Sequence, residues 1–253
     1  MKQLKNLILI FAFAFSVFFL VPALLSSQFG PYDLIKWGDV LDLLTPLVLI
    51  PLYWLLFWVG REEGPGKVEG IVFLVLAALW IEGQGLHLAA NSIGHMLSDF
   101  VGTDAETLTY FYDERLSHYM WHFAVMGLSV LLLWRQWRFP FEGERSSLGM
   151  EGVAGFLYGF TFFLIIMEGQ TAYFGLPFAI IVTVAGLIWG RSQFRQQPLL
   201  GFFWIAYLIA AVVSTGWWIY WGGTSRNFRD RLVWMMVSVT LQVTVTLPIT
   251  CDD

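Results

Sequence analysis

Long apolar runs alternate with short polar connections along most of the chain. Each run has roughly the 20 residues that an α-helix needs to cross a bilayer. The runs are continuous, without strand-like alternation of apolar and polar residues, so helices must satisfy the backbone hydrogen bonds in lipid. The pattern predicts an all-α polytopic integral membrane helical bundle with 7–8 transmembrane helices. The expected spans cover residues 6–26, 41–60, 68–92, 117–134, 149–168, 172–190, 198–221 and 231–249.

The first segment has two interpretations. Residues 1–27 combine a basic start, an apolar stretch and small residues near Ser26, as a secretory signal peptide does. They are expected to be either the first membrane segment or a cleaved signal peptide. No linker divides the rest, so residues 1–253 are expected to form a single transmembrane domain.

Composition narrows the class of protein. The chain is 57% hydrophobic and only 13% charged, whereas about a quarter of the residues of a soluble domain are charged. The net charge is −5 and the basic residues are scattered, which argues against nucleic acid as a partner. Cys251 is the only cysteine, so a bound metal would need nitrogen and oxygen ligands. No phosphate-binding loop or serine nucleophile elbow occurs.

The distribution of Lys and Arg predicts the orientation, because cytoplasmic loops are enriched in both. A cytoplasmic N-terminus in a bacterial-type plasma membrane places the larger set inside. That set is Lys2, Lys5, Arg61, Lys67, Arg135, Arg138, Arg145, Arg191 and Arg195, against Lys36, Arg115, Arg226, Arg229 and Arg231 outside. The longest connection, residues 96–116, is acidic and is expected to lie on the outer side.

All four histidines of the chain fall between residues 87 and 122. They belong to two sets of polar residues, each spaced four apart and therefore on one face of a helix. The sets are His87, Asn91 and His95 in the third segment, and Glu114, His118 and His122 before and in the fourth. If the two helices are antiparallel neighbours, matching their levels pairs His87 with His122, Asn91 with His118, and His95 with Glu114. A shift of one turn, which the intervening connection permits, pairs different residues.

This spacing predicts a metal site. His118 and His122 lie one turn apart, as paired histidine ligands of zinc often do. His87 and His95 are about 12 Å apart along their helix, too far to share one ion, so one of them is expected to complete the site. Zinc, iron and copper all accept such ligands.

Carboxylates near the histidines are candidates for further roles. Glu114 and Glu82 are expected to transfer protons, while Asn91, Asp113 and Glu168 are candidate cofactor-binding residues. Acids at helix starts, namely Asp39, Asp42, Glu69 and Glu151, are expected to be N-terminal caps. Gly83, Gly85 and Gly94 are expected to permit close helix approach.

Several functions remain open. The leading expectation is a metal-dependent enzyme acting on a membrane lipid or small hydrophobic substrate near the outer leaflet. The alternatives are a haem b electron carrier with two histidine ligands, a metal or proton carrier or channel, and a polar network that only packs helices.

A weak internal similarity also occurs. Residues 68–85 and 150–171 both carry Glu-Gly directly after their first residue and both include Glu-Gly-Gln near their ends. The spacing differs between the two copies, so a strict repeat is not supported. Both duplication of a helix pair and chance remain open.

Overall fold

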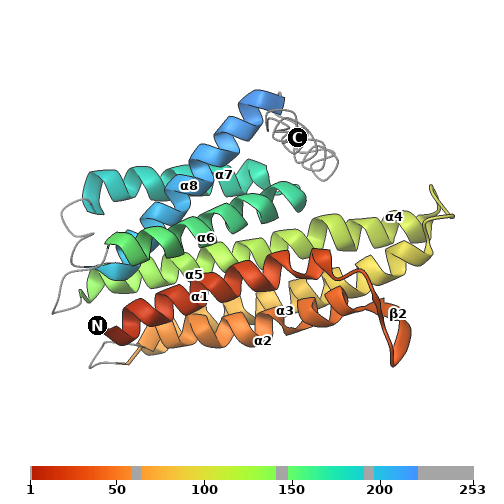
Figure 1. The fold of residues 1–253 in the computed structure, drawn as a ribbon, viewed down its shortest axis with the longest axis horizontal. Coiled ribbons are helices and arrows are strands. Elements are labelled where there is room, and N and C mark those ends of the chain that lie inside the picture. Colours follow the sequence, from red (N-terminus) through yellow and green to blue (C-terminus); the bar gives the residue numbers. More distant parts are fainter. Residues whose placement is uncertain (1, 59–63, 141–147, 191–196, 222–253) are drawn as a thin grey trace, which may run out of the picture.

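The computed structural model describes residues 2–58, 64–140, 148–190 and 197–221, and this part of the chain is a bundle of membrane-length helices (Figure 1). Seven of its helical segments are long and apolar enough to cross a membrane, which confirms the all-α polytopic prediction. The expected span 231–249 lies outside the described residues. The elements are α1 (Lys2–Leu20), β1 (Gln28–Phe29), β2 (Tyr32–Lys36), α2 (Trp37–Trp58), α3 (Lys67–Met96), α4 (Asp104–Tyr110), α5 (His118–Arg138), α6 (Leu148–Glu168), α7 (Ala172–Ala185) and α8 (Pro198–Trp221).

The acidic connection expected over residues 96–116 is mostly helical. α3 continues to Met96, and α4 is joined to α5 by a π-helix, Phe111–Ser117, here called η2. Thr103 starts α4 by accepting a hydrogen bond from the N–H of Glu106, whose carboxylate accepts one from the N–H of Gly102. The sequence Thr103-x-x-Glu106 matches the capping-box pattern, but the Glu106 carboxylate accepts from the residue before the N-cap. Figure 1 shows α3 and α4 extending past the ends of the other helices.

Large aromatic side chains fill the middle of the bundle. Phe11 and Phe15 of α1 pack on Tyr158 of α6 with ring centroids 5.7 and 4.1 Å apart. The hydroxyls of Tyr53 and Tyr158 are 2.9 Å apart, and Ser129 of α5 lies 3.2 Å from the Tyr158 hydroxyl. In this low-dielectric environment these hydroxyls satisfy one another and link α2, α5 and α6.

Near the start of α3, opposite the histidines, a buried ion pair joins α3 and α5. Arg135 Nη1 lies 2.5 Å from Glu69 Oε2, and Arg135 Nε donates to the carbonyl of Phe57 over 3.2 Å. Glu69 also accepts a hydrogen bond of 2.9 Å from the N–H of Gly66, so its predicted capping role is confirmed. This carboxylate therefore caps α3 and fastens it to α5.

Candidate functional site

Three helices deliver polar residues to the same depth of the bundle. His87 lies twenty residues after Lys67, His118 twenty residues before Arg138, and Glu168 twenty residues after Leu148. At 1.5 Å per residue, each is about 30 Å from the opposite end of its helix. The polar cluster thus sits where α1 ends and α2 begins, at one boundary of the apolar spans.

Each of three histidines presents its Nδ1 atom to an acceptor. His87 Nδ1 lies 2.7 Å from a carboxylate oxygen of Asp113, and His118 Nδ1 lies 3.3 Å from the carbonyl oxygen of Glu114. His122 Nδ1 lies 2.9 Å from the hydroxyl oxygen of Thr171. His118 and His122 are almost completely buried, while His87 is partly buried.

The predicted pairing of His87 with His122 is wrong by one helical turn. His87 packs instead against His118, with ring centroids 4.7 Å apart, and reaches Asp113 a further turn away. Gly83 explains the register, because a Cβ atom there would lie 2.9 Å from the backbone nitrogen of Trp121. Spacing alone could not reveal the register set by this backbone contact.

Gly83 provides a direct test of the α3–α5 contact. Gly83→Ala should separate the two helices and lower the free energy of unfolding by about 1–3 kcal/mol, as other overpacked sites do. Gly85→Ala is the matched control, since a Cβ atom at Gly85 would meet nothing within 4 Å. Unfolding in mixed detergent micelles measures both variants. Equal stability of the two would contradict the close approach.

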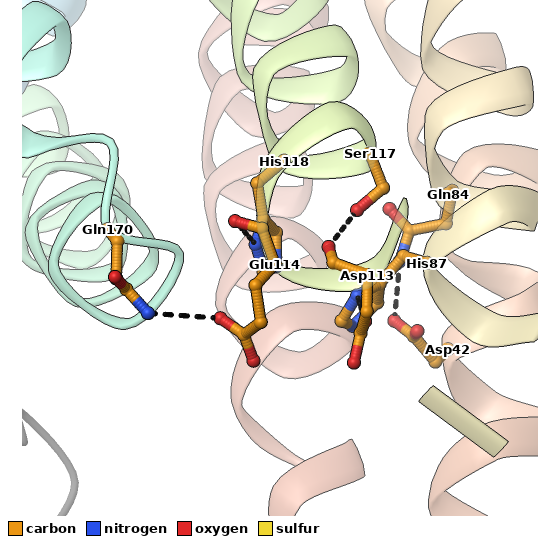
Figure 2. Close-up of polar contacts among 8 residues, drawn as sticks. All are labelled: Asp42, Gln84, His87, Asp113, Glu114, Ser117, His118 and Gln170. Carbon is orange, nitrogen blue, oxygen red and sulfur yellow. Dashed lines mark hydrogen bonds and ion pairs between the residues drawn. The ribbon is translucent and has the colours of Figure 1, made fainter. Parts of the chain in front are cut away.

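Two glutamine side chains hold carboxylates around the histidines. Gln84 Nε2 donates to Asp42 over 2.7 Å, and Gln170 Nε2 donates to Glu114 over 3.3 Å. Figure 2 shows these pairs on opposite sides of Asp113 and His118. Asp42 was expected to cap α2, but its carboxylate bonds Gln84, and Asp39 instead accepts from the N–H of Lys36 over 2.8 Å.

The remaining candidates are less involved in the cluster. Glu82 and His95 are exposed, and Asn91 is half-buried on the extension of α3. Glu168 is exposed at the end of α6, near enough to His87 and Glu114 to interact with them electrostatically. The structure thus gathers His87, His118, His122, Asp113 and Glu114, with Glu168 at the margin.

Sequence reasoning missed Gln84, Gln170 and Thr171, although a signal was present. Both glutamines end a Glu-Gly-Gln triplet, and both triplets place their glycine against the start of α5. A Cβ atom at Gly83 would lie against the backbone of Trp121, and a Cβ atom at Gly169 would lie 2.7 Å from Cε1 of His122. The weak internal similarity therefore marks the two segments that flank the histidines.

The described residues contain no group of three or more His, Cys, Asp or Glu side chains already arranged to hold a metal ion. Three histidine rings form a row, with centroids 4.7 Å apart for His87 and His118 and 5.8 Å apart for His118 and His122. The His87 and His118 rings are in contact, which leaves no space for a porphyrin between them. Haem ligation by this pair therefore gains no support.

The fold and the polar cluster define a multi-pass membrane protein with a buried histidine and carboxylate centre at one boundary of its spans. Comparison of the chain with protein-family models, with curated proteins and with solved structures gave no match.

Proposed function

We propose that this protein is an integral membrane metalloenzyme that binds one transition-metal ion through the Nε2 atoms of His87, His118 and His122. The proposed substrate is a membrane lipid or a small hydrophobic molecule that reaches the site from the outer leaflet. The orientation rests on the Lys and Arg distribution, which favours a cytoplasmic N-terminus in a bacterial-type plasma membrane and puts the site outside.

One observation carries the metal proposal: the three Nδ1 atoms all face oxygen acceptors. The Glu114 carbonyl can only accept a hydrogen bond, so His118 bears a hydrogen on Nδ1, while His87 Nδ1 lies at ion-pair distance from the Asp113 carboxylate. The Thr171 hydroxyl donates to the carbonyl of Ile166 over 3.4 Å, which leaves its oxygen to accept from His122 Nδ1. The Nε2 lone pairs of His118 and His122 are then available, as is that of His87 in its neutral form, which is the arrangement that outer-shell partners impose on metal-binding histidines.

Burial and spacing support the same proposal. His122 Nε2 is buried and has no hydrogen-bond partner among the described residues, a costly state for a polar atom in an apolar interior. With metal–nitrogen bonds near 2 Å, rings bound tetrahedrally have centroids about 5 Å apart, close to the 4.7 and 5.8 Å observed. Binding requires side-chain rotation that brings the His87 and His122 rings toward a common point.

Charge supports a cation in the cluster. Asp42, Asp113 and Glu114 lie around the histidines, and Glu168 interacts with His87 and His118 electrostatically. Several carboxylates at a membrane boundary are costly unless protons or a cation compensate them. A divalent ion would offset part of this charge and act as a Lewis acid toward a carbonyl or a water molecule.

Glu114 is the proposed proton-transfer residue. It is half-buried, follows Asp113 in η2, and is held by Gln170, so its carboxylate is fixed beside the His118 turn. An aromatic layer separates this end from the interior: Phe19 stacks on Trp80 and Trp121 with centroids 6.2 and 5.0 Å apart. That layer favours chemistry at the boundary over a continuous polar path across the bundle.

Protein purified in mild detergent tests the proposal. We expect about one zinc, iron or copper ion per chain, and release of acyl product from fluorogenic acyl esters or amides presented in micelles. Glu114→Gln should retain the metal and lower turnover at least 100-fold, within the usual range for removal of a general acid or base. Asp99→Asn, on the exposed connection after α3, is the control. A metal-free wild-type protein would contradict the metal site. Full turnover by Glu114→Gln would contradict the role of Glu114 in proton transfer.

A further inference from the structure

The turn between α6 and α7 has an unusual backbone. Gln170 adopts a φ of 53°, the only positive φ found at a non-glycine residue within the described ranges. Such a conformation is uncommon outside glycine, asparagine and aspartate, and it often marks a functional constraint. Glycine would adopt it freely, so its occupation by glutamine calls for a physical reason.

Side-chain contacts of the turn supply that reason. The Gln170 amide lies 3.3 Å from Glu114 Oε2 and 3.5 Å from the Tyr110 hydroxyl, and so ties the turn to η2 and α4. Next to it, the backbone of Gly169 packs on two histidine rings. A Cβ atom at Gly169 would lie 2.7 Å from His122 Cε1 and 3.2 Å from His118 Cγ.

Thr171 is placed by the same turn. Its backbone N–H donates to the carbonyl of Ile166 over 2.9 Å, and its hydroxyl donates to that carbonyl over 3.4 Å. The hydroxyl oxygen is thereby directed at His122 Nδ1, 2.9 Å away. Both residues are buried, so water does not compete for this contact.

We propose that Thr171 is a positioning residue that fixes the tautomer and tilt of His122, and that the Gly169–Thr171 turn exists to hold it there. The function of this device rests on the proposed metal site, whereas the contact itself does not. Gly83 and Gln84 provide a parallel arrangement on α3, with the glycine against α5 and the amide on Asp42.

The decisive pair of variants is Thr171→Val, which keeps the shape and removes the hydroxyl, and Thr171→Ser, which restores it. Thr183→Val is the matched control, because Thr183 is a buried threonine whose hydroxyl donates to the carbonyl of Ala179 in its own helix. The metal-free proteins are labelled with ¹⁵N-histidine, and zinc affinity is measured by titration in the same detergent.

Thr171→Val should shift the His122 ring nitrogens toward a mixture of tautomers and weaken zinc binding 10- to 100-fold, as loss of an outer-shell partner does elsewhere. Thr171→Ser should restore both, and Thr183→Val should alter neither. Unchanged His122 nitrogen signals in Thr171→Val would overturn the positioning role, whatever the zinc result. Absence of zinc binding by the wild type would instead overturn the proposed function, while the nitrogen signals still report on Thr171.

Discussion

Replacing His122 with alanine is expected to remove nearly all bound metal from the purified protein. His122 is completely buried, its Nδ1 atom faces the Thr171 hydroxyl, and its Nε2 atom has no hydrogen-bond partner among the described residues. Loss of one of the three proposed protein ligands would leave two imidazoles, too few for a stable tetrahedral site with open positions for substrate. Elemental analysis after gel filtration in detergent measures the metal retained per chain.

His118→Ala should have the same effect, because its ring lies between those of His87 and His122. His95→Ala is the informative comparison, since His95 was an equal candidate by spacing but is exposed on the extension of α3. It should keep the full metal content. Loss of metal in His95→Ala, with retention in His122→Ala, would show that the ligand set is wrong.

A separate measurement distinguishes loss of a ligand from loss of the fold. Removing the His122 side chain also leaves a cavity beside Trp121 and Phe174, whose rings lie 3.6 and 6.4 Å from the imidazole. His122→Gln retains much of the volume without an imidazole. If His122→Gln binds no metal and is as stable to unfolding as the metal-free wild type, the loss of metal is due to the missing imidazole and not to a damaged fold.

The spans could be predicted from the sequence because lipid imposes both their length and their composition. The first seven agree with the structure. The connection over residues 96–116 was expected only as an acidic link between two spans, whereas the structure makes it mostly helical, through the Thr103 N-cap and η2. A π-helix changes the phase of the residues after it, and its presence cannot be read from four-residue spacing.

Three histidines of the cluster and two of its carboxylates, Asp113 and Glu114, were among the candidates that the sequence offered. Spacing correctly suggested that helical histidines gather at one level, but His95 drops out because α3 extends beyond the bundle there. Asp42 was expected to be a cap because it lies near the start of the second span, and only the position of Gln84 on a neighbouring helix brings its carboxylate to the polar cluster. Thr171 carried no pattern of its own. Contacts between distant segments decided each of these cases.

The ion pair at the other end of the bundle should have a large effect on stability without touching the site. Arg135 is only 2% exposed, and its charge is met by Glu69 and the Phe57 carbonyl. Its side chain also lies over the Phe57 ring, 5.0 Å from the centroid. Removing one partner of a buried pair leaves the other charge poorly compensated, which costs about 3–5 kcal/mol in proteins.

Glu69→Gln is therefore expected to lower the free energy of unfolding by about 3 kcal/mol, near the lower limit because Glu69 is partly exposed. Glutamine can still accept a hydrogen bond from the N–H of Gly66, so the helix cap is retained. The loss of stability then measures the ion pair alone. Arg138→Met, which removes an exposed arginine three residues away, should change stability little. Adding Arg135→Met to Glu69→Gln should recover part of the loss, because no buried charge then remains at that position. If the two residues act independently, the double variant should instead lose the sum of the stability losses of Glu69→Gln and Arg135→Met. Metal content should stay constant in all of these variants.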